Sequence, residues 1–429
     1  MKKINVTGLN EVVYYEKLEN GLDVYIYKKE GFNQKRINFV TKYGSMYNEF
    51  IPIGEDKMKT FPKGIAHFLE HKNFEMEDGK NAFTEFERYG AYVNAYTTTD
   101  HTCYYVTTSD YFYECLNYLL DFVQTPYFTD ENVLKEKGII EQEINMTNDN
   151  INRFIHETSL NEVLFTNPRK YSVIGTKEDI SAITKEDLYT CYNTFYHPSN
   201  MILTISGDID VDKTINEIKN NQKKKKYNKL DKIVIPTYKE ENDVKTEYEK
   251  YIKNVSNDKI NITYKYVYKD IIQDKIQIAK RKLFNYIMLQ MKFGSLSDFE
   301  KELIDKKIVK TYLNYGDSSF DDVNLLIFNA DVLNEEKLIN AIDENLKNNE
   351  LKEEEFNLYK KAILTSEVRM YDNPSNISER IYRDIIHCGD FVNDYYDIIK
   401  NYTYKEFINM YNSLDFSKKS ILYVTNKED

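Results

Sequence analysis

The feature that most constrains this chain is a segment that occurs twice, about half a chain length apart. Residues 184–207 (TKEDLYTCYNTFYHPSNMILTISG) align without gaps with residues 403–426 (TYKEFINMYNSLDFSKKSILYVTN) at an offset of 219. Similar side chains coincide at several positions, among them Tyr192 and Tyr411, and Ile202 and Ile421. Each copy predicts a helix, a loop and a closing strand, so we expect one α+β unit to occur twice. Chance similarity in a chain of biased composition is the alternative.

A chain of 429 residues is too long for one ordinary hydrophobic core and indicates two domains of roughly 200 residues each. We expect an α+β fold of two homologous domains, 1–218 and 232–429, with mixed or antiparallel sheets packed with helices. The lysine-rich run at 219–231 (KNNQKKKKYNKLD) predicts a solvated linker. The elements expected in the first half are strands at 23–28, 36–43 and 201–206, a hairpin at 92–108, and helices at 64–74, 81–89, 110–123 and 130–146.

The composition restricts the partners of the chain. The N-terminal residues MKKINVT lack the apolar run of a secretory signal, and no stretch approaches the roughly 18 apolar residues of a membrane helix. The four cysteines are scattered, as expected for reduced thiols in a cytoplasmic protein. A net charge of −12 argues against a nucleic-acid partner and is compatible with basic peptide substrates.

The motif with the most chemical content lies in residues 64–74, which read GIAHFLEHKNF. On a helix, His67 and His71 stand four residues apart and project from one face, where two imidazoles can hold Zn2+. Glu70 lies beside that face, where a base can take a proton from a water activated by the zinc. A surface helix with two histidines and a chance glutamate is the alternative, but two histidines this close need partners for their ring nitrogens.

A catalytic zinc ion takes a third protein ligand and keeps one open position. The predicted helix at 130–146 is the best supplier of that ligand. Glu136 and Glu143 are seven residues apart, about two helical turns, and therefore share one face. Glu141 points elsewhere and is expected to be solvated.

Around this motif the sequence resembles the pitrilysin and insulinase family of inverzincin zinc peptidases, from residue 64 to residue 208. GIAHFLEH resembles the zinc helix of that family, NAYTTTDHTCYY (94–105) its substrate-edge hairpin, and EKGIIEQEINM (136–146) the segment with the third ligand. The resemblance implies that Glu143 is the third ligand and that Glu136 supports the site from behind. It also implies that Asn94, Ala95 and Tyr96 pair with the substrate backbone.

The length and the repeat resemble the short branch of the family, which includes the mitochondrial processing peptidase and its bacterial relatives. In that branch two chains of two domains each close around a peptide chamber. Active members carry an Arg and a Tyr, seven residues apart, in the C-terminal half. At the matching positions this chain has Ile304 in place of the arginine, and only Tyr312 could serve as the tyrosine. The counterparts of His67–His71 in the second half, residues 286–290 (YIMLQ), cannot bind zinc.

The sequence therefore predicts a cytoplasmic zinc endopeptidase that cleaves extended peptides inside a closed chamber, with Glu70 as the base. A homologous partner subunit is expected to supply the missing Arg and Tyr in a heterodimer, with a homodimer as the alternative. A misplaced alignment, with Arg281 in the arginine role, is the rival explanation. The competing function is a non-catalytic scaffold or binding subunit of the same fold. A structural zinc site is less consistent, because such sites favour four closed ligands.

Overall fold

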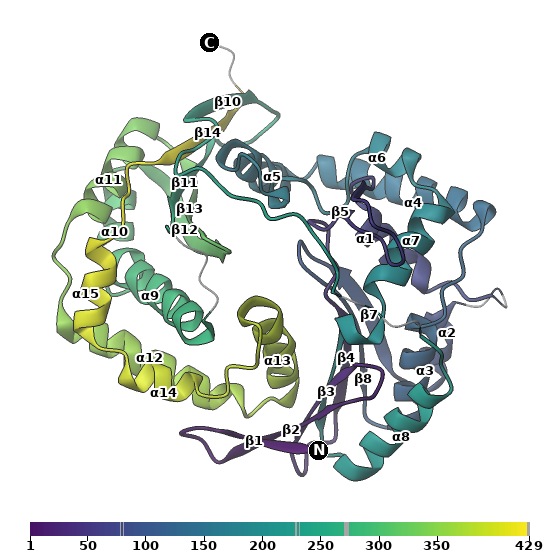
Figure 1. Ribbon diagram of the computed structural model, residues 1–429. Coiled ribbons are helices and arrows are strands. Elements are labelled where there is room, and N and C mark those ends of the chain that lie inside the picture. Colours follow the sequence, from purple (N-terminus) through teal and green to yellow (C-terminus); the bar gives the residue numbers. More distant parts are fainter. Residues whose placement is uncertain (78, 80, 228–229, 231, 270–273, 427–429) are drawn as a thin grey trace. The chain divides into compact units, whose positions relative to one another are not determined.

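The computed structural model describes residues 1–77, 79, 81–227, 230, 232–269 and 274–426 (Figure 1). The chain forms two compact units, and each contains segments from both halves of the sequence. Unit 1 comprises Met1–Thr147, Tyr171–Thr237 and Val368–Asn393. Unit 2 comprises Asn148–Lys170, Tyr238–Glu367 and Asp394–Asp429.

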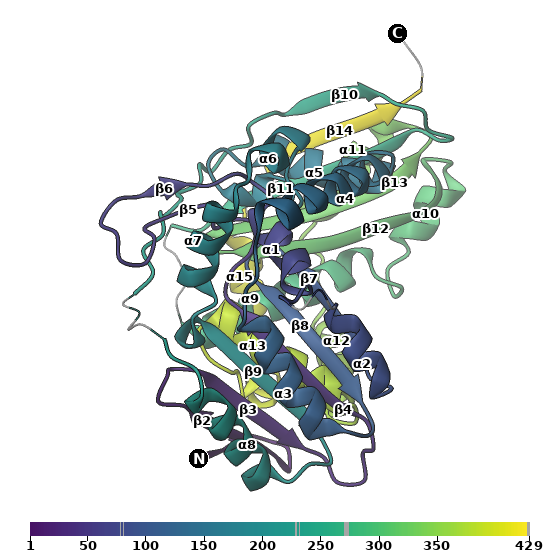
Figure 2. The ribbon, with the colours of Figure 1, turned by 90° about the vertical axis from the view of Figure 1, so that its right-hand side faces the viewer.

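Unit 1 is built on a seven-stranded sheet with the order β1-β2-β3-β9-β4-β8-β7. Strands β3 and β9 are parallel, and β9, β4, β8 and β7 pair antiparallel in succession (Figure 2). β7 therefore lies at one edge of the sheet. The strands are β1 Lys2–Val6, β2 Glu11–Lys17, β3 Asp23–Lys28, β4 Lys35–Thr41, β7 Tyr92–Thr97, β8 Thr102–Thr108 and β9 Met201–Gly207, and a separate short ribbon is formed by β5 Glu49–Phe50 and β6 Lys59–Thr60.

Unit 2 contains a five-stranded sheet with the order β10-β14-β11-β13-β12. This order repeats β3-β9-β4-β8-β7 strand for strand, including the single parallel pair, here β10 with β14. The predicted duplication of an α+β unit is therefore confirmed at the level of topology. The strands are β10 Tyr248–Ile252, β11 Lys259–Val267, β12 Val309–Phe320, β13 Val323–Val332 and β14 Lys419–Thr425.

Helices cover both faces of each sheet. In unit 1 the larger core lies between the sheet and helices that include α1 and α3, while α13 covers the opposite face (Figure 1). In unit 2 the larger core includes residues of α9, α11 and α15, and α5 packs against β11 and β14. The helices are α1 Ile65–Asn73, α2 Ala82–Arg88, α3 Phe112–Val123, α4 Asp130–Asn148, α5 Ile151–Val163, α6 Lys177–Ala182, α7 Lys185–Phe195, α8 Val211–Lys223, α9 Lys275–Phe293, α10 Phe299–Asp305, α11 Glu335–Lys347, α12 Glu353–Met370, α13 Pro374–Cys388, α14 Tyr395–Asn401 and α15 Tyr404–Asn412.

The repeated segment has the same local structure in both copies. Thr184 caps α7 and Thr403 caps α15, each through a capping box with the acidic residue three positions later. The gapless alignment fails in the strand that follows. Ile202 faces the core beneath α13, whereas Ile421 faces the larger core of unit 2, so the two side chains lie on opposite faces of equivalent strands. A one-residue shift in register produces this inversion.

The compact units differ from the predicted contiguous domains 1–218 and 232–429. Helix α5 of the first half belongs to unit 2, and α13 of the second half belongs to unit 1. The predicted linker at 219–231 also begins too early, because α8 continues to Lys223 and buries Ile218, Asn221 and Gln222. Among the described residues, no helix is both long enough and apolar enough to cross a membrane.

Candidate metal centre

Helix α1 carries the HxxEH motif, and its start is fixed by a glycine. Gly64 caps the helix with φ 80°, a backbone conformation that side chains other than hydrogen rarely allow. A Cβ atom at this position would lie 2.4 Å from the carbonyl oxygen of Ile174. At the other end, the amide of Asn73 donates to the buried hydroxyl of Tyr104 on β8, at 2.8 Å. The hydrogen bond between Asn73 and Tyr104 joins α1 to the sheet of unit 1.

His67, His71 and Glu143 come together beside α1. Their ligand atoms all lie within 4.8 Å of one another. Nε2 of His67 lies 3.8 Å from one carboxylate oxygen of Glu143, and Nε2 of His71 lies 3.7 Å from the other. Tetrahedral zinc with bonds of about 2.0–2.1 Å separates its ligand atoms by roughly 3.3 Å, so small side-chain movements suffice. Two imidazoles and one carboxylate also form a known donor set of catalytic zinc.

Glu136 contacts the same group of side chains from behind. Its carboxylate lies 2.9 Å from Nδ1 of His71, which leaves Nε2 of that ring directed toward Glu143. The Glu136 side chain is buried, in contrast to that of Glu143, which is one-third exposed. Burial alone would lower the pKa of His71, but the hydrogen bond to Glu136 and the nearby carboxylates outweigh it and raise the pKa. Glu141 is absent from the cluster that the described residues form.

Glu70 is buried beside the cluster and accepts a hydrogen bond from the hydroxyl of Thr97 on β7, at 2.6 Å. Burial raises the pKa of Glu70 because it disfavours the charged carboxylate, and the Thr97 hydrogen bond partly opposes this shift. The bond occupies Oε2 and leaves Oε1 for other partners. Thr97 was not anticipated as a site residue. Its position directly after Tyr96 in the predicted substrate-edge hairpin was the only signal.

The predicted substrate residues Asn94, Ala95 and Tyr96 lie on β7, at the edge of the sheet. The side-chain oxygen of Asn94 accepts the backbone N–H of Ala95 at 2.9 Å. The N–H of Ala95 therefore points away from β8. Because the direction of the backbone N–H and C=O groups alternates along a strand, those of Asn94 and Tyr96 face β8. The hydroxyl of Tyr96 lies 2.5 Å from that of Tyr382 on α13. Of the three residues, Ala95 offers its backbone N–H outward.

The positions in the second half also have defined surroundings. Ile304 on α10 and Tyr312 on β12 are exposed. Arg281 on α9 is 2% exposed and donates to the backbone carbonyl of Asp321 at 3.1 Å. A buried guanidinium bonded to the backbone does not fit the alternative in which Arg281 contacts substrate. Residues 286–290, the counterparts of the zinc motif, lie within α9.

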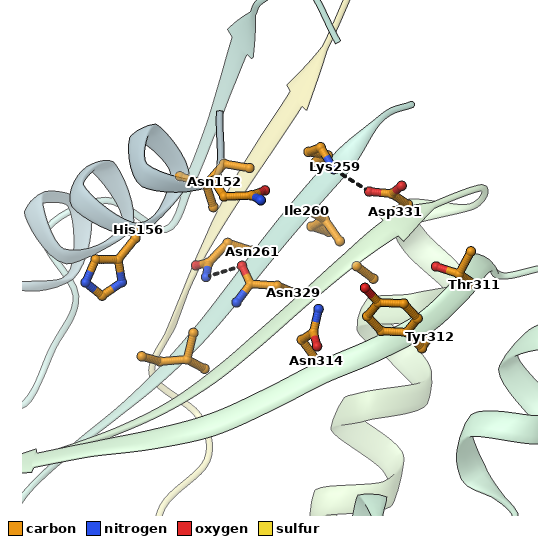
Figure 3. A pocket seen from close by; sticks show the side chains of 13 residues that line it. Asn152, His156, Lys259, Ile260, Asn261, Thr311, Tyr312, Asn314, Asn329 and Asp331 are labelled. Carbon is orange, nitrogen blue, oxygen red and sulfur yellow. Dashed lines mark hydrogen bonds and ion pairs between the residues drawn. The ribbon is translucent and has the colours of Figure 1, made fainter. Parts of the chain in front are cut away.

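Unit 2 contains a separate polar cavity of about 390 Å3 beside α5 (Figure 3). Its floor includes Asn261, Asn329 and Asn314, which stand in register on the adjacent strands β11, β13 and β12. The Asn261 amide donates to the Asn329 side-chain oxygen at 3.0 Å. The cavity shows that α5 covers only part of this sheet face, and its residues contribute nothing to the metal cluster.

Comparison with known proteins identifies the family to which this fold belongs. The family description "Insulinase (Peptidase family M16)" matches residues 50–177, and "Peptidase M16 inactive domain" matches residues 182–363. The uncharacterized zinc protease YmfH of Bacillus subtilis is 40% identical over 306 residues, which cover 71% of each chain. The beta subunit of the mitochondrial-processing peptidase of Caenorhabditis elegans is 28% identical over 38% of this chain and 36% of its own.

A solved structure supports the same relationship. The crystal structure of an M16-like peptidase from Alicyclobacillus acidocaldarius superposes with a TM-score of 0.90, at 29% identity, over 98% of this chain and 99% of the other. The protein belongs to peptidase family M16, whose members include proteins named as zinc proteases. The predicted resemblance and the predicted α+β fold are thereby confirmed.

Proposed function

We propose that this chain is the zinc-bearing subunit of an endopeptidase. His67, His71 and Glu143 hold the metal, and Glu136 orients His71 through Nδ1. The observation that carries the proposal is a buried carboxylate, Glu70, directly beside a three-residue zinc donor set. Zinc held there would polarise the carbonyl of the scissile bond and make a water more acidic.

Glu70 acts as the general base in this proposal. Its Oε1 takes a proton from the attacking water, while Thr97 holds Oε2 in place. The same carboxyl group then returns the proton to the leaving amine, so the peptide bond is hydrolysed without net change at Glu70. The raised pKa that burial gives Glu70 favours this return step.

The proposed substrate is an extended peptide that adds to the sheet as a further strand. β7 is the edge next to the metal cluster, and the outward N–H of Ala95 is the first group available for pairing. An incoming carbonyl replaces the side chain of Asn94 on that N–H. Asn94 and Tyr96 then take part through their side chains, because their backbone groups face β8.

We further propose that a homologous partner completes the site. Ile304 cannot donate a hydrogen bond to a developing oxyanion, and buried Arg281 is already bonded. A heterodimer with a homologue that carries the Arg and Tyr supplies both groups. A homodimer of this chain lacks the arginine, because both copies have Ile304 at that position. The chamber and the cytoplasmic location remain predictions from the sequence.

The second candidate function is a non-catalytic scaffold of the same fold. A scaffold has no use for a base held next to three metal-binding side chains, so the complete set favours the peptidase. The scaffold reading gains support only from the match of residues 182–363 to a domain described as inactive.

One experiment separates the two functions. The chain is purified with its candidate partner, its zinc content is measured, and cleavage of a quenched-peptide library is followed before and after metal chelation. We expect one zinc per chain, loss of cleavage on chelation and recovery on zinc addition. Glu70→Gln is the matched control, because it keeps the ligands and should lose roughly 10²–10⁴-fold in turnover with zinc still bound. Equal cleavage by zinc-loaded Glu70→Gln would exclude this mechanism, and absence of zinc would favour the scaffold.

A further inference from the structure

Unit 1 contains a concave region lined in part by described residues of the lysine-rich run, which the peptidase function leaves unused. A cavity of about 1200 Å3 lies between the turn that joins β2 to β3 and the C-terminal part of α8. A cavity of about 450 Å3 adjoins it, and the two share Ser199 and Leu230. We call the two cavities together the lysine trough. Figure 2 shows β2, β3 and α8 close together at one end of the unit.

Lysine dominates the charge of the trough. Seven lysines line it: Lys17, Lys42, Lys219, Lys223, Lys225, Lys226 and Lys232. Among the described lining residues, the acidic ones are Glu16 and Glu19. Glu16 is already engaged, since its carboxylate contacts both the N-terminal amine at 2.5 Å and Lys219 at 2.6 Å. This concentration of positive charge contrasts with the net charge of −12 on the chain.

Several of these lysines already have protein partners. Lys225 pairs with Asp121 at 2.9 Å and donates to the Leu120 carbonyl, so it is part of the scaffold. Lys223 and Lys226 have no ion pair or hydrogen bond with the described residues. Among the described residues, none competes with a ligand for these two ammonium groups.

Lys42 supplies an independent observation that points to an anion. Its side chain is half-buried, and its ammonium group makes no hydrogen bond or ion pair with the described residues. Burial lowers the pKa of Lys42, the charge of Asp23 opposes the shift, and repulsion from Lys17 adds to it. A partly buried cation without a contacting counter-ion is unfavourable, and a bound anion would supply that contact.

We propose that the lysine trough binds an oligophosphate anion, of which a nucleoside triphosphate and inorganic polyphosphate are the two sources. Lysine ammonium groups bind phosphate oxygens as mobile point charges, through charge-assisted hydrogen bonds. A phosphoanhydride chain concentrates several negative charges in a short length, which suits a concave region lined by several lysines. An acidic peptide spreads its charges along the chain and matches a compact group of lysines less well. The site is independent of the proposed zinc function.

Binding of tripolyphosphate and ATP to the full-length protein is measured by titration calorimetry and by thermal shift. We expect both to bind, to raise the melting temperature, and to weaken as salt is added. Binding of ATP alone would assign the site to the nucleotide, and equal binding of both would assign it to the phosphate chain. Equal binding of poly-glutamate, or no binding of either phosphate, would overturn the proposal.

Two variants locate the site. Lys42→Gln should weaken tripolyphosphate binding about tenfold, the effect of one charge-assisted hydrogen bond. It should also leave the ligand-free protein as stable as before or more so, because a half-buried charge without a contacting partner is removed. The double variant Lys223→Gln/Lys226→Gln should weaken binding further. Lys57→Gln, an exposed lysine outside the trough, is the matched control and should change nothing. Unchanged binding by both trough variants would place the ligand elsewhere and contradict the proposal.

Discussion

Among the carboxylates of α4, Glu143 is distinguished by its position near Nε2 of both His67 and His71, not by its local sequence. The helical phase placed Glu136 and Glu143 on one face from the sequence alone, and both now lie against His71. The Thr97 contact with Glu70 could not be predicted in the same way. It joins a strand to a helix, and no spacing rule relates side chains across two elements.

The carboxylates of α4 should differ sharply in their effect on zinc affinity. Glu143→Gln removes a ligand and should cause severe loss of zinc. Glu136→Gln should weaken binding by roughly 10–100-fold, because His71 loses its orienting partner. Glu141→Gln serves as the control on the same helix. Competition with a zinc chelator measures all three, and a larger effect of Glu141→Gln than of Glu143→Gln would overturn the assignment of ligands.

Thr97 should act as a positioning residue for Glu70. Thr97→Val removes the hydroxyl while keeping the shape, and a hydrogen bond to a charged group contributes about 1.5–3 kcal/mol. We expect kcat to fall by about 10–100-fold, with zinc content and KM little changed. Thr97→Ser keeps the hydroxyl and should restore most of the activity. A matching loss in Thr97→Ser would show that packing of the methyl group, not the hydrogen bond, is responsible.

At the scale of elements, the sequence predicted the repeated helix and strand but not where two of the helices pack. The capping boxes of α7 and α15 can be predicted from the sequence, because each depends on two residues only three positions apart. The register shift between Ile202 and Ile421 follows from loop length and was invisible in a gapless alignment. The placement of α5 in unit 2 and α13 in unit 1 depends on tertiary packing, which no periodicity encodes.

A buried ion pair fixes the end of α5 in unit 2. Glu240 contacts Lys265 at 2.7 Å and accepts the backbone N–H groups of Phe165, Thr166 and Asn167. Both charged side chains are fully buried. Burial alone would raise the pKa of Glu240, but the hydrogen bonds outweigh it and lower the pKa to about 2. The ion pair thus joins the segment after α5 to strand β11.

Glu240 should make the free energy of unfolding depend on pH in the acidic range. Its pKa is lower in the folded protein than its ordinary value of 4.5, so its contribution is complete above pH 4.5 and is lost as the pH falls toward 2. Glu240→Gln leaves Lys265 buried without its partner and should lower the free energy of unfolding by about 3–5 kcal/mol at pH 7. Urea unfolding at pH 7 and pH 3 measures both effects. Glu241→Gln, an exposed neighbour, is the control, and an equal loss there would refute the role of the ion pair.

At the scale of the whole molecule, the predicted dependence on a partner subunit can be tested directly. The isolated chain should turn over a mixed peptide library about 10²–10³-fold more slowly than the chain with a homologue that carries the Arg and Tyr, because an oxyanion donor is missing. Zinc content should be the same in both samples. Full turnover by the isolated chain would exclude the obligate heterodimer and leave the proposed zinc site unaffected.

The exchange of α5 and α13 has a consequence for the order in which the protein can fold during synthesis. Unit 1 contains the metal-binding side chains but also requires Val368–Asn393, which includes α13. At about 5–20 residues per second, the ribosome needs roughly eight to thirty seconds to pass from residue 237 to residue 393. During that interval, one face of the sheet of unit 1 is not yet covered by α13. Newly made chains therefore expose the apolar residues that later pack beneath α13, and the unit with the proposed zinc site cannot be completed before residue 393 has been made.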